Sequence, residues 1–330
     1  MKKLEMSQVK FAIPKGSLEE ATFKILEKSW TKVNRKDRTY RVFLDDPNII
    51  VKMLRPQEIP TLVSDGLYDV GITGKDWVGE TNADVKPILD LEYGKIRLVI
   101  AFPDKYSFKN LDAMIGDYAQ KKKILRISSE YLTTASKFIK ECKSYKKYYG
   151  NKDPLIVTPW VRLGTNKNVQ IHLSFGATEA KPPEDVDAIM DVTETGTTLK
   201  QNKLKIVDEV LTSTAHLIAN NQSLKDPQKR EKIFDIVTLM RGAVHGRKYL
   251  HIYLNVEEKN LKLLLKQMPS LKKPTVSPLS EEGWYGVNTV IKKEEFHKLI
   301  PKLRKIAQGL VVHEPRQILD LEEIKRDEEN

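Results

Sequence analysis

Residues 186–199 read Val-Asp-Ala-Ile-Met-Asp-Val-Thr-Glu-Thr-Gly-Thr-Thr-Leu. The apolar run at 186–190 is interrupted only by Asp187, which predicts a short buried strand. Gly196 allows the backbone to turn with a positive φ and to approach a ligand closely. A helix is expected to follow at 199–202. The stretch therefore predicts a strand, a glycine turn and the start of a helix.

The same stretch carries polar groups that suit a phosphorylated sugar. N–H groups at the start of a helix, joined by threonine hydroxyls, form a cradle for a phosphate. The carboxylates of Asp191 and Glu194 would repel a phosphate, but they suit sugar hydroxyls or a Mg²⁺ ion carried with it. Plain helix capping by threonine remains the alternative that this pattern leaves open.

Composition sets the broad class of the protein. The chain has 330 residues, enough for two or three domains, and 40% of them are hydrophobic. No apolar run reaches the roughly 18 residues of a transmembrane helix, and the start has no apolar signal region. Cys142 is the only cysteine, so no disulfide framework is expected. These features predict a cytoplasmic protein without a membrane partner.

The net charge is +11, which would suit nucleic acid or small anionic substrates. The lysines are scattered, however, at 121–123, 143–147 and 262–273. No aromatic-rich RNA-binding signature accompanies them. We therefore expect a solvated basic surface and no nucleic-acid partner.

Strands and helices alternate along the first two thirds of the chain. Strands are expected at 9–13, 41–43, 49–53, 68–76, 96–102, 124–129, 170–175 and 215–219, with helices at 18–30, 61–66 and 131–149. This order predicts a parallel α/β sheet. Because ligands in such sheets lie beyond the carboxyl ends of the strands, three glycine turns are expected to share one edge. They are Pro14-Lys15-Gly16, Gly71-Ile72-Thr73-Gly74 and Thr195-Gly196-Thr197-Thr198.

The pattern changes after an expected connecting helix at 228–242. Strands at 249–256, 275–278, 286–291 and 309–312 enclose helices at 257–267 and 293–306. This order, βαββαβ, predicts a small ferredoxin-like domain. It carries few polar candidates for catalysis, so a regulatory or assembly role is expected. Residues 321–330 form a charged tail.

Several site types are excluded. The six histidines are not paired at metal-ligand spacing. No Gly-x-Ser-x-Gly elbow or Cys–His pattern suggests a covalent nucleophile. No phosphate-binding loop of the Gly-x-x-x-x-Gly-Lys type is present, so ATP would be bound in another way.

An ordered set of motifs resembles the ATP phosphoribosyltransferase family, the first enzyme of histidine biosynthesis. The motifs include Arg55-Pro56-Gln57-Glu58-Ile59-Pro60, Gly176-Ala177-Thr178-Glu179 and the block 191–199, together with 11–18, 69–76, 211–220 and 274–284. The last block resembles the C-terminal domain of the family's long form. The resemblance covers nearly the whole chain, with Ser17 where the family frequently has Arg.

The resemblance implies a fold and a domain plan. We expect two periplasmic-binding-protein-like lobes around a cleft, plus a C-terminal ferredoxin-like (ACT-like) βαββαβ domain. Lobe I would comprise 1–104 and 212–228, and the PRPP-binding lobe II would comprise 105–211. Residues 229–320 would form a regulatory histidine-binding domain.

The implied reaction joins ATP to phosphoribosyl pyrophosphate (PRPP) with Mg²⁺ and releases pyrophosphate. L-Histidine would be the feedback inhibitor, and dimers would assemble into hexamers. Two other classes remain as alternatives: a non-catalytic module that binds a small anion, and a purine-type phosphoribosyltransferase that uses a free base.

The resemblance also implies residue roles. The implied catalytic residues are Asp191, Glu179 and Lys15, with Asp191 facing Mg²⁺ through PRPP or water. The implied ligands of the PRPP phosphate are Glu194, Thr195, Gly196, Thr197, Thr198 and Leu199. The implied contacts of ATP or pyrophosphate are Lys15, Gly16, Arg55, Gly74 and Asp76. The implied histidine contacts are Asn255, Leu271, Thr275 and Leu310.

Overall fold

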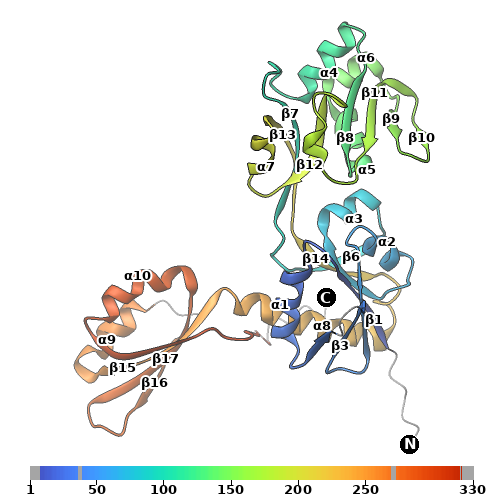
Figure 1. Ribbon diagram of the computed structural model, residues 1–330. Helices are drawn as coiled ribbons and strands as arrows, with labels where there is room; N and C mark the ends of the chain where they lie inside the picture. Colours follow the sequence, from blue (N-terminus) through green and yellow to red (C-terminus); the bar gives the residue numbers. More distant parts are fainter. Residues whose placement is uncertain (1–7, 36–38, 269–272, 320, 322–330) are drawn as a thin grey trace, which may run out of the picture. The chain divides into compact units, whose positions relative to one another are not determined.

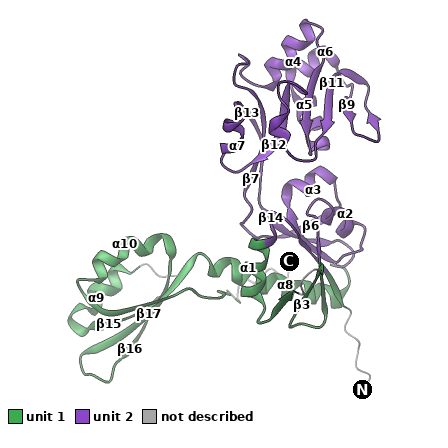
Figure 2. Ribbon diagram, viewed as in Figure 1, with its two compact units in different colours: residues 1–10, 20–52, 224–330 green, residues 11–19, 53–223 purple. Residues whose placement is uncertain are grey.

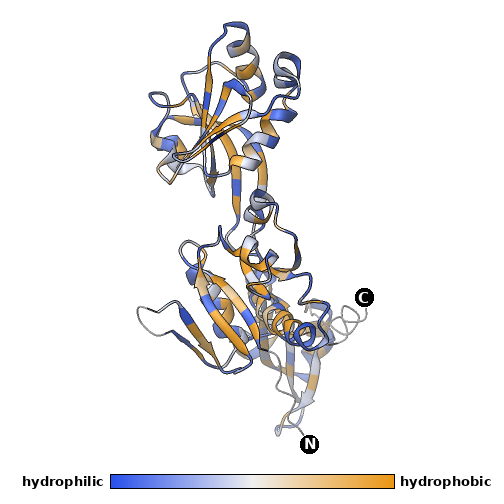
Figure 3. Ribbon diagram, turned by 90° about the vertical axis from the view of Figure 1, so that its right-hand side faces the viewer, coloured by the Kyte–Doolittle hydropathy of each residue, from blue (hydrophilic) through white to orange (hydrophobic). Residues whose placement is uncertain are grey.

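A computed structural model describes residues 8–35, 39–268, 273–319 and 321 (Figure 1). Two compact units are distinguished in Figure 2. The first unit comprises 1–10, 20–52 and 224–330, and the second comprises 11–19 and 53–223. Within the described ranges the strands form three sheets, whose apolar residues are concentrated along the strands (Figure 3).

The first sheet has seven strands in the order β2-β3-β4-β1-β5-β14-β6. Its strands are β1 (Val9–Pro14), β2 (Val33–Arg35), β3 (Arg41–Leu44), β4 (Ile49–Leu54), β5 (Val70–Gly74), β6 (Val85–Asp90) and β14 (Ala215–Asn220). The first helices are α1 (Glu19–Ser29), α2 (Ile59–Ser64) and α3 (Lys75–Thr81). The pair β1–β5 is parallel, but β14 is antiparallel to both β5 and β6. The pairs β2–β3 and β3–β4 are antiparallel as well, so the expectation of a parallel sheet is wrong for this sheet.

Close packing of α2 on β5 explains one glycine of the turn at 71–74. A Cβ atom on Gly71 would lie 2.5 Å from Cγ2 of Ile59 and 3.0 Å from Cγ2 of Val63. Both neighbours belong to a buried cluster with Ala12 and Ile218. Gly71 is thus required by helix–sheet packing.

We expect Gly71→Ala to lower the free energy of unfolding by about 1–3 kcal/mol, because the added methyl group overpacks this cluster. Urea unfolding measures the change. Gly79→Ala is the control, since a Cβ atom there meets no atom within 4 Å. Equal stability of both variants would contradict the packing argument.

The second sheet has the order β10-β9-β11-β8-β12-β7-β13. Its strands are β7 (Ile96–Pro103), β8 (Leu125–Ser129), β9 (Pro154–Val157), β10 (Arg162–Leu163), β11 (Asn166–Leu173), β12 (Ala188–Thr193) and β13 (Leu204–Ser213). The four central strands, β9, β11, β8 and β12, are mutually parallel, whereas β7 and β13 are antiparallel. This sheet is therefore mixed as well.

Helices cover one face of the second sheet, over a buried core that includes Ile127, Ile171 and Met190. They are α4 (Leu111–Gln120), α5 (Leu132–Glu141) and α6 (Lys143–Tyr149). The single helix expected at 131–149 is thus two helices, because the backbone of Cys142 is extended with ψ 133°. A smaller core on the other face includes Ile189, Leu199 and Leu204.

The third sheet has the order β16-β17-β15-β18. Its elements are β15 (Tyr249–Glu257), α9 (Glu258–Gln267), β16 (Thr275–Pro278), β17 (Trp284–Lys292), α10 (Lys293–Leu303) and β18 (Ala307–His313). With two helices packed on one face, this is the expected ferredoxin-like topology.

The connecting helix α8 (Pro227–Gly246) starts with Pro227 in its first turn and with Asp226 accepting from the amides of Gln228 and Lys229. It is four residues longer at its end than expected. The segment after β18 returns along it, and the Ile318 amide donates to the Gly242 carbonyl at 3.0 Å. In the described part of the chain, no helix is long and apolar enough to span a membrane.

Candidate active site

A cavity of about 330 Å³ lies at the carboxyl end of β12 and the start of α7 (Thr197–Gln201). Residues 191–199 supply all but one of its lining side chains. The lining residues are Glu179, Asp191, Val192, Thr193, Glu194, Thr195, Thr197, Thr198 and Leu199. The structure thus brings five of the six expected phosphate ligands, all except Gly196, to one cavity together with the carboxylates of Asp191 and Glu179.

The turn before α7 is shaped for an anion. Gly196 has φ +80°, a conformation that side chains rarely adopt, and its amide donates to Thr193 Oγ1 at 2.8 Å. Thr195 Oγ1 lies 2.8 Å from Thr197 Oγ1. The helix begins at Thr197, two residues before the expected start, so Thr198 lies in its first turn. Gly196, at the N-cap, has no side chain to cap the helix, and the Thr197 amide donates to Thr195 Oγ1 at 3.4 Å. The amides of Thr198 and Leu199 are therefore the first-turn donors proposed for a phosphate.

Asp191 is a half-buried carboxyl group in this cavity. Burial raises its pKa to about 6, and the nearby carboxylates of Glu179 and Glu130 add to the rise. Hydrogen bonds from the Val192 amide and the Thr178 hydroxyl oppose it. A cation or a sugar hydroxyl would therefore favour the ionised form.

The loop after β11 holds Glu179 in place. The hydroxyls of Ser174 and Thr178 lie 2.9 Å apart, and Lys181 Nζ donates to Ser174 at 2.8 Å and to Ser128 at 3.1 Å. Lys181 therefore ties this loop to β8. Neither Lys181 nor Glu130 was predicted from the sequence, although Glu130 directly follows a predicted strand.

Lys15, Gly16 and Arg55 meet at the carboxyl ends of β1 and β4. The Lys15 amide donates to the Leu54 carbonyl at 2.8 Å, and a Cβ atom on Gly16 would lie 3.4 Å from the Arg55 guanidinium. These residues belong to the first sheet, whereas the turn at 195–198 belongs to the second. The expectation that three turns share one edge is therefore wrong, because the strands divide between two sheets.

Asp76 is buried, and its carboxylate has protein partners. It accepts from the Tyr131 and Ser213 hydroxyls, each at 2.6 Å. A Cβ atom on Gly74 would lie 2.2 Å from Oδ1 of Asp76, so the glycine makes room for this carboxylate. Trp77 also stacks on Tyr131 with ring centroids 4.4 Å apart. A direct contact of Gly74 or Asp76 with ATP stays a prediction.

The acidic side chains suit an ion that arrives with its substrate. Across the residues that the structure describes, no group of three His, Cys, Asp or Glu could hold a metal. Mg²⁺ is commonly bound by one or two carboxylates together with substrate phosphates. Asp191, with Glu179 beside it, fits that kind of site.

In the small domain, Asn255 carries a buried Oδ1 atom that has no hydrogen-bond partner among the described residues. The neighbouring strand β18 is irregular here, since Tyr253 pairs with Val311 but Asn255 pairs with Gln308. Leu310 lies in this irregular segment and packs against the domain core. Thr275 starts β16 and is exposed, and Leu271 lies outside the described residues.

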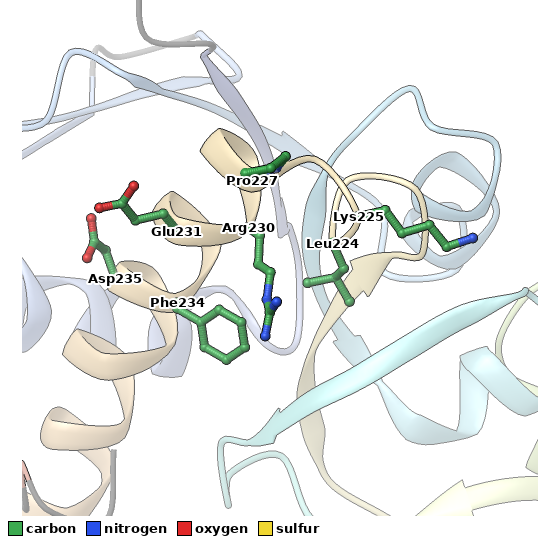
Figure 4. Close-up of a pocket in the computed structure, with 7 residues that line it drawn as sticks. All are labelled: Leu224, Lys225, Pro227, Arg230, Glu231, Phe234 and Asp235. Carbon is green, nitrogen blue, oxygen red and sulfur yellow. The ribbon is translucent and has the colours of Figure 1, made fainter. Parts of the chain in front are cut away.

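A larger cavity, of about 640 Å³, lies at the start of α8 (Figure 4). Leu224, Pro227 and Phe234 form its apolar lining, and Arg230 extends over it. None of the expected site residues lines this cavity.

The turn at 195–198 and the carboxylates of Asp191 and Glu179 lie in one cavity at the edge of an α/β sheet, an arrangement that suits a phosphorylated sugar. The chain matches the ATP phosphoribosyltransferase family over residues 55–242 and the HisG C-terminal domain over residues 246–314. The chain therefore belongs to the ATP phosphoribosyltransferase family, in the long form with the C-terminal domain.

Relatives agree over nearly the full length. The ATP phosphoribosyltransferase of Solibacter usitatus is 37% identical over 312 residues, covering 93% of this chain and 97% of the relative. That of Pelotomaculum thermopropionicum is 33% identical over 313 residues, covering 93% and 98%. A chain of the ATP phosphoribosyl transferase (HisG:HisZ) complex from Thermotoga maritima has a TM-score of 0.54 at 25% identity, covering 71% of this chain and 96% of that one. The expected family and fold class are confirmed.

Proposed function

We propose that this enzyme transfers the phosphoribosyl group of PRPP to N1 of ATP, the first step of histidine biosynthesis. The observation that carries the proposal is the cavity shared by the α7 start, Asp191 and Glu179. The phosphate of PRPP needs hydrogen-bond donors, and the adjoining ribose suits carboxylates. This cavity supplies both kinds of group side by side. Residues 105–211 would form the PRPP-binding lobe, and 1–104 with 212–228 the other.

In this proposal the chain acts through position and charge. Amides and hydroxyls of residues 195–199 hold the 5-phosphate, so that the anomeric carbon lies toward Asp191 and Glu179. The bond from adenine N1 to that carbon forms as the carbon–oxygen bond to pyrophosphate breaks, and its electron pair leaves with pyrophosphate. Both carboxylates stabilise the positive charge that develops on the sugar. Lys15 and Arg55 are the cations proposed for pyrophosphate or for the ATP phosphates.

Mg²⁺ is the proposed cofactor. When bound, it would neutralise the charge of the leaving pyrophosphate. Asp191 would hold the Mg²⁺ ion through PRPP or through water. The acidic neighbours of Asp191, Glu179 and Glu130, would add to the attraction for this cation.

The product assay tests the reaction. Incubating the protein with ATP, PRPP and Mg²⁺ should produce the absorbance of phosphoribosyl-ATP, and replacing ATP by adenine should produce none. If the protein binds PRPP but forms no product, the result would favour the alternative of a non-catalytic module that binds a small anion. Product from adenine would instead indicate a purine-type enzyme.

The small domain is the proposed site of feedback inhibition by L-histidine. The unpartnered Oδ1 of Asn255 is an acceptor suited to the α-amino group of an amino acid. Thr275, Leu271 and Leu310 are proposed as further contacts. We also propose that the chain forms dimers that assemble into hexamers, in the cytoplasm, where a biosynthetic enzyme meets ATP and PRPP.

A further inference from the structure

In the part of the chain that the structure describes, the backbone passes between the first and the second sheet only twice. One passage joins β6 to β7 through 91–95, and the other joins β13 to β14 through Thr214. The two passages lie side by side, since the Ala215 amide donates to the Tyr93 carbonyl at 2.9 Å. Two short connections of this kind can act as a hinge, because a few residues absorb a change in the angle between two rigid parts. Contacts outside the passages are therefore needed to fix that angle.

One such contact joins α3 to α5, and both helices belong to the second compact unit. The carboxylate of Glu80, in the last turn of α3, accepts from the Thr133 amide at 2.8 Å and from the Thr134 amide at 2.9 Å. The Thr134 hydroxyl also donates to this carboxylate, at 2.7 Å. Three donors from the first turn of α5 thus bind one side chain of the helix that follows β5.

Helix α5 has no cap from its own sequence. Tyr131, the residue before the helix, makes no side-chain capping hydrogen bond, and the first turn contains no acidic residue. The first amides of a helix need acceptors, and a carboxylate is favourable there because the N-terminus carries partial positive charge. Glu80 supplies the acceptor from 53 and 54 positions earlier in the chain. We refer to its three hydrogen bonds as the Glu80 cap.

The same face of α3 makes a second contact beside the Glu80 cap. Asp76 and Glu80 are four residues apart and therefore lie on one face of the helix. The Tyr131 hydroxyl donates to Asp76 at 2.6 Å, and the Trp77 ring stacks on the ring of Tyr131. Asp76 also accepts from Ser213, the last residue of β13. This face of α3 is thus bonded both to the start of α5 and to one of the two passages.

The Glu80 cap connects the two sheet edges that carry the proposed substrate contacts. Helix α3 begins at the carboxyl end of β5, and β5 is parallel to β1, which ends next to Lys15. Helix α5 follows the carboxyl end of β8, and β8 is parallel to β12, which leads into the turn at 195–198. Neighbouring parallel strands end at the same edge of a sheet. A change in the angle between the sheets would therefore move the two groups of substrate contacts relative to each other.

We propose that Glu80 is a positioning residue, which fixes the second sheet and its PRPP cavity relative to the first sheet with Lys15 and Arg55. The inference rests on the proposed function in one respect, because it takes the reaction to need groups from both sheets. Glu80 acts through α5 and touches no reacting atom. Without the Glu80 cap the angle between the sheets would vary, so turnover would fall. Binding of ribose 5-phosphate, which needs only the second sheet, would stay the same.

Two variants that each remove a helix cap test this inference on the full-length protein. Glu80→Ala removes the cap that joins the sheets. Asn110→Ala removes the cap of α4, where the Asn110 side chain accepts from the Ala113 amide at 3.0 Å. Helices α4 and α5 have ten residues each and cover the same face of the second sheet, so the two variants should lose similar stability. Only the first variant loses a contact between the sheets.

We expect kcat for phosphoribosyl-ATP formation to fall roughly ten- to hundredfold in Glu80→Ala, the usual effect of a small misplacement of reacting groups. Asn110→Ala should keep the turnover of wild type. The Kd of ribose 5-phosphate, measured by calorimetry, should be unchanged in both variants. Glu80→Gln keeps one acceptor oxygen and should recover part of the lost turnover.

The angle between the sheets can be measured without the reaction. Spin labels on Lys86→Cys in β6 and Lys146→Cys in α6, both at exposed positions, report the distance between the two parts. Cys142→Ser provides the background, and dilution with unlabelled protein removes distances between copies of the chain. We expect a broader spread of distances when Glu80→Ala is added, and no broadening when Asn110→Ala is added.

Two results would overturn the inference. One is wild-type turnover with an unchanged spread of distances in Glu80→Ala. The other is an equal loss of turnover in Asn110→Ala, or weaker binding of ribose 5-phosphate in Glu80→Ala, since either would show that the carboxylate only maintains the second sheet. Failure of the proposed function looks different, because wild type would then form no phosphoribosyl-ATP while Glu80→Ala still broadened the distances.

Discussion

Replacing Asp191 by Asn is expected to lower turnover by a factor of about 10²–10³, the usual loss when one preorganised charge-stabilising group is removed. The substitution keeps the shape of the side chain and removes only its charge. In the proposed reaction that charge faces a sugar carbon that becomes positive in the transition state. The loss should therefore appear in kcat, measured as the initial rate of phosphoribosyl-ATP formation at saturating ATP and PRPP.

Stability should not fall with the activity. The pKa of Asp191 is raised from 3.8 to about 6 in the folded protein, so ionising this group costs stability as the pH rises from about 4 to 6. Above pH 6 the neutral amide of the Asp191→Asn variant avoids that cost, and the variant should unfold at the same temperature as wild type or higher. Asp185→Asn, at an exposed carboxylate, is the control. Full turnover in the Asp191→Asn variant at matched stability would remove Asp191 from the site.

Proton release provides a second readout of the same group. At pH 6 about half of the Asp191 side chains are protonated. Binding of PRPP with Mg²⁺ favours the carboxylate, so at pH 6 wild type should release more protons per site than the Asp191→Asn variant, and at pH 8 the two should release the same number. Calorimetry in buffers of different ionisation enthalpy measures this difference, which excludes the protons that the PRPP phosphate releases in both proteins.

Excising residues 248–313 is expected to abolish inhibition by histidine while turnover is retained. The cut must spare α8, because Ile233, Ile236 and Met240 are buried in the first unit. It must also spare the segment after β18, since the Arg316 guanidinium donates to the carbonyls of Lys28 at 3.0 Å and Glu27 at 2.7 Å. A Cβ atom on Gly246 would lie 3.0 Å from the Pro315 carbonyl, so the two ends can be rejoined by a short glycine linker.

The control for this excision is Asn255→Ala, which removes the unpartnered acceptor and leaves the rest of the domain in place. It should lose inhibition and keep turnover. Histidine inhibition that survives the excision would place the effector site elsewhere in the chain. Loss of turnover together with inhibition would show instead that the small domain is needed for assembly of the active enzyme.

Local patterns predicted much of this protein. A strand at 186–190, a glycine turn and a following helix were expected, and the strand is found at 188–193. The apolar run and Gly196 lie within one short stretch of sequence. The βαββαβ order of the small domain was also expected from its periodicity. Strand β13 was not expected, because it is only partly buried along most of its length and shows no continuous apolar run.

The unforeseen contacts in the site join distant parts of the chain. The partners of Asp76 are Tyr131 and Ser213, which are 55 and 137 positions away. Lys181 bonds to Ser128 across 53 positions. Long-range strand pairing also decides which sheet each strand joins. It places the turn at 14–16 at the first sheet and the turn at 195–198 at the second. No local pattern could predict these pairs.

The most direct test is a crystal structure of the enzyme with PRPP and Mg²⁺. The 5-phosphate is predicted to lie within hydrogen-bond distance of the Thr198 and Leu199 amides and of the threonine hydroxyls in the turn at 195–198, with the ribose hydroxyls toward Asp191 and Glu179. A 5-phosphate bound at Lys15 and Arg55 or at any other place would contradict the account.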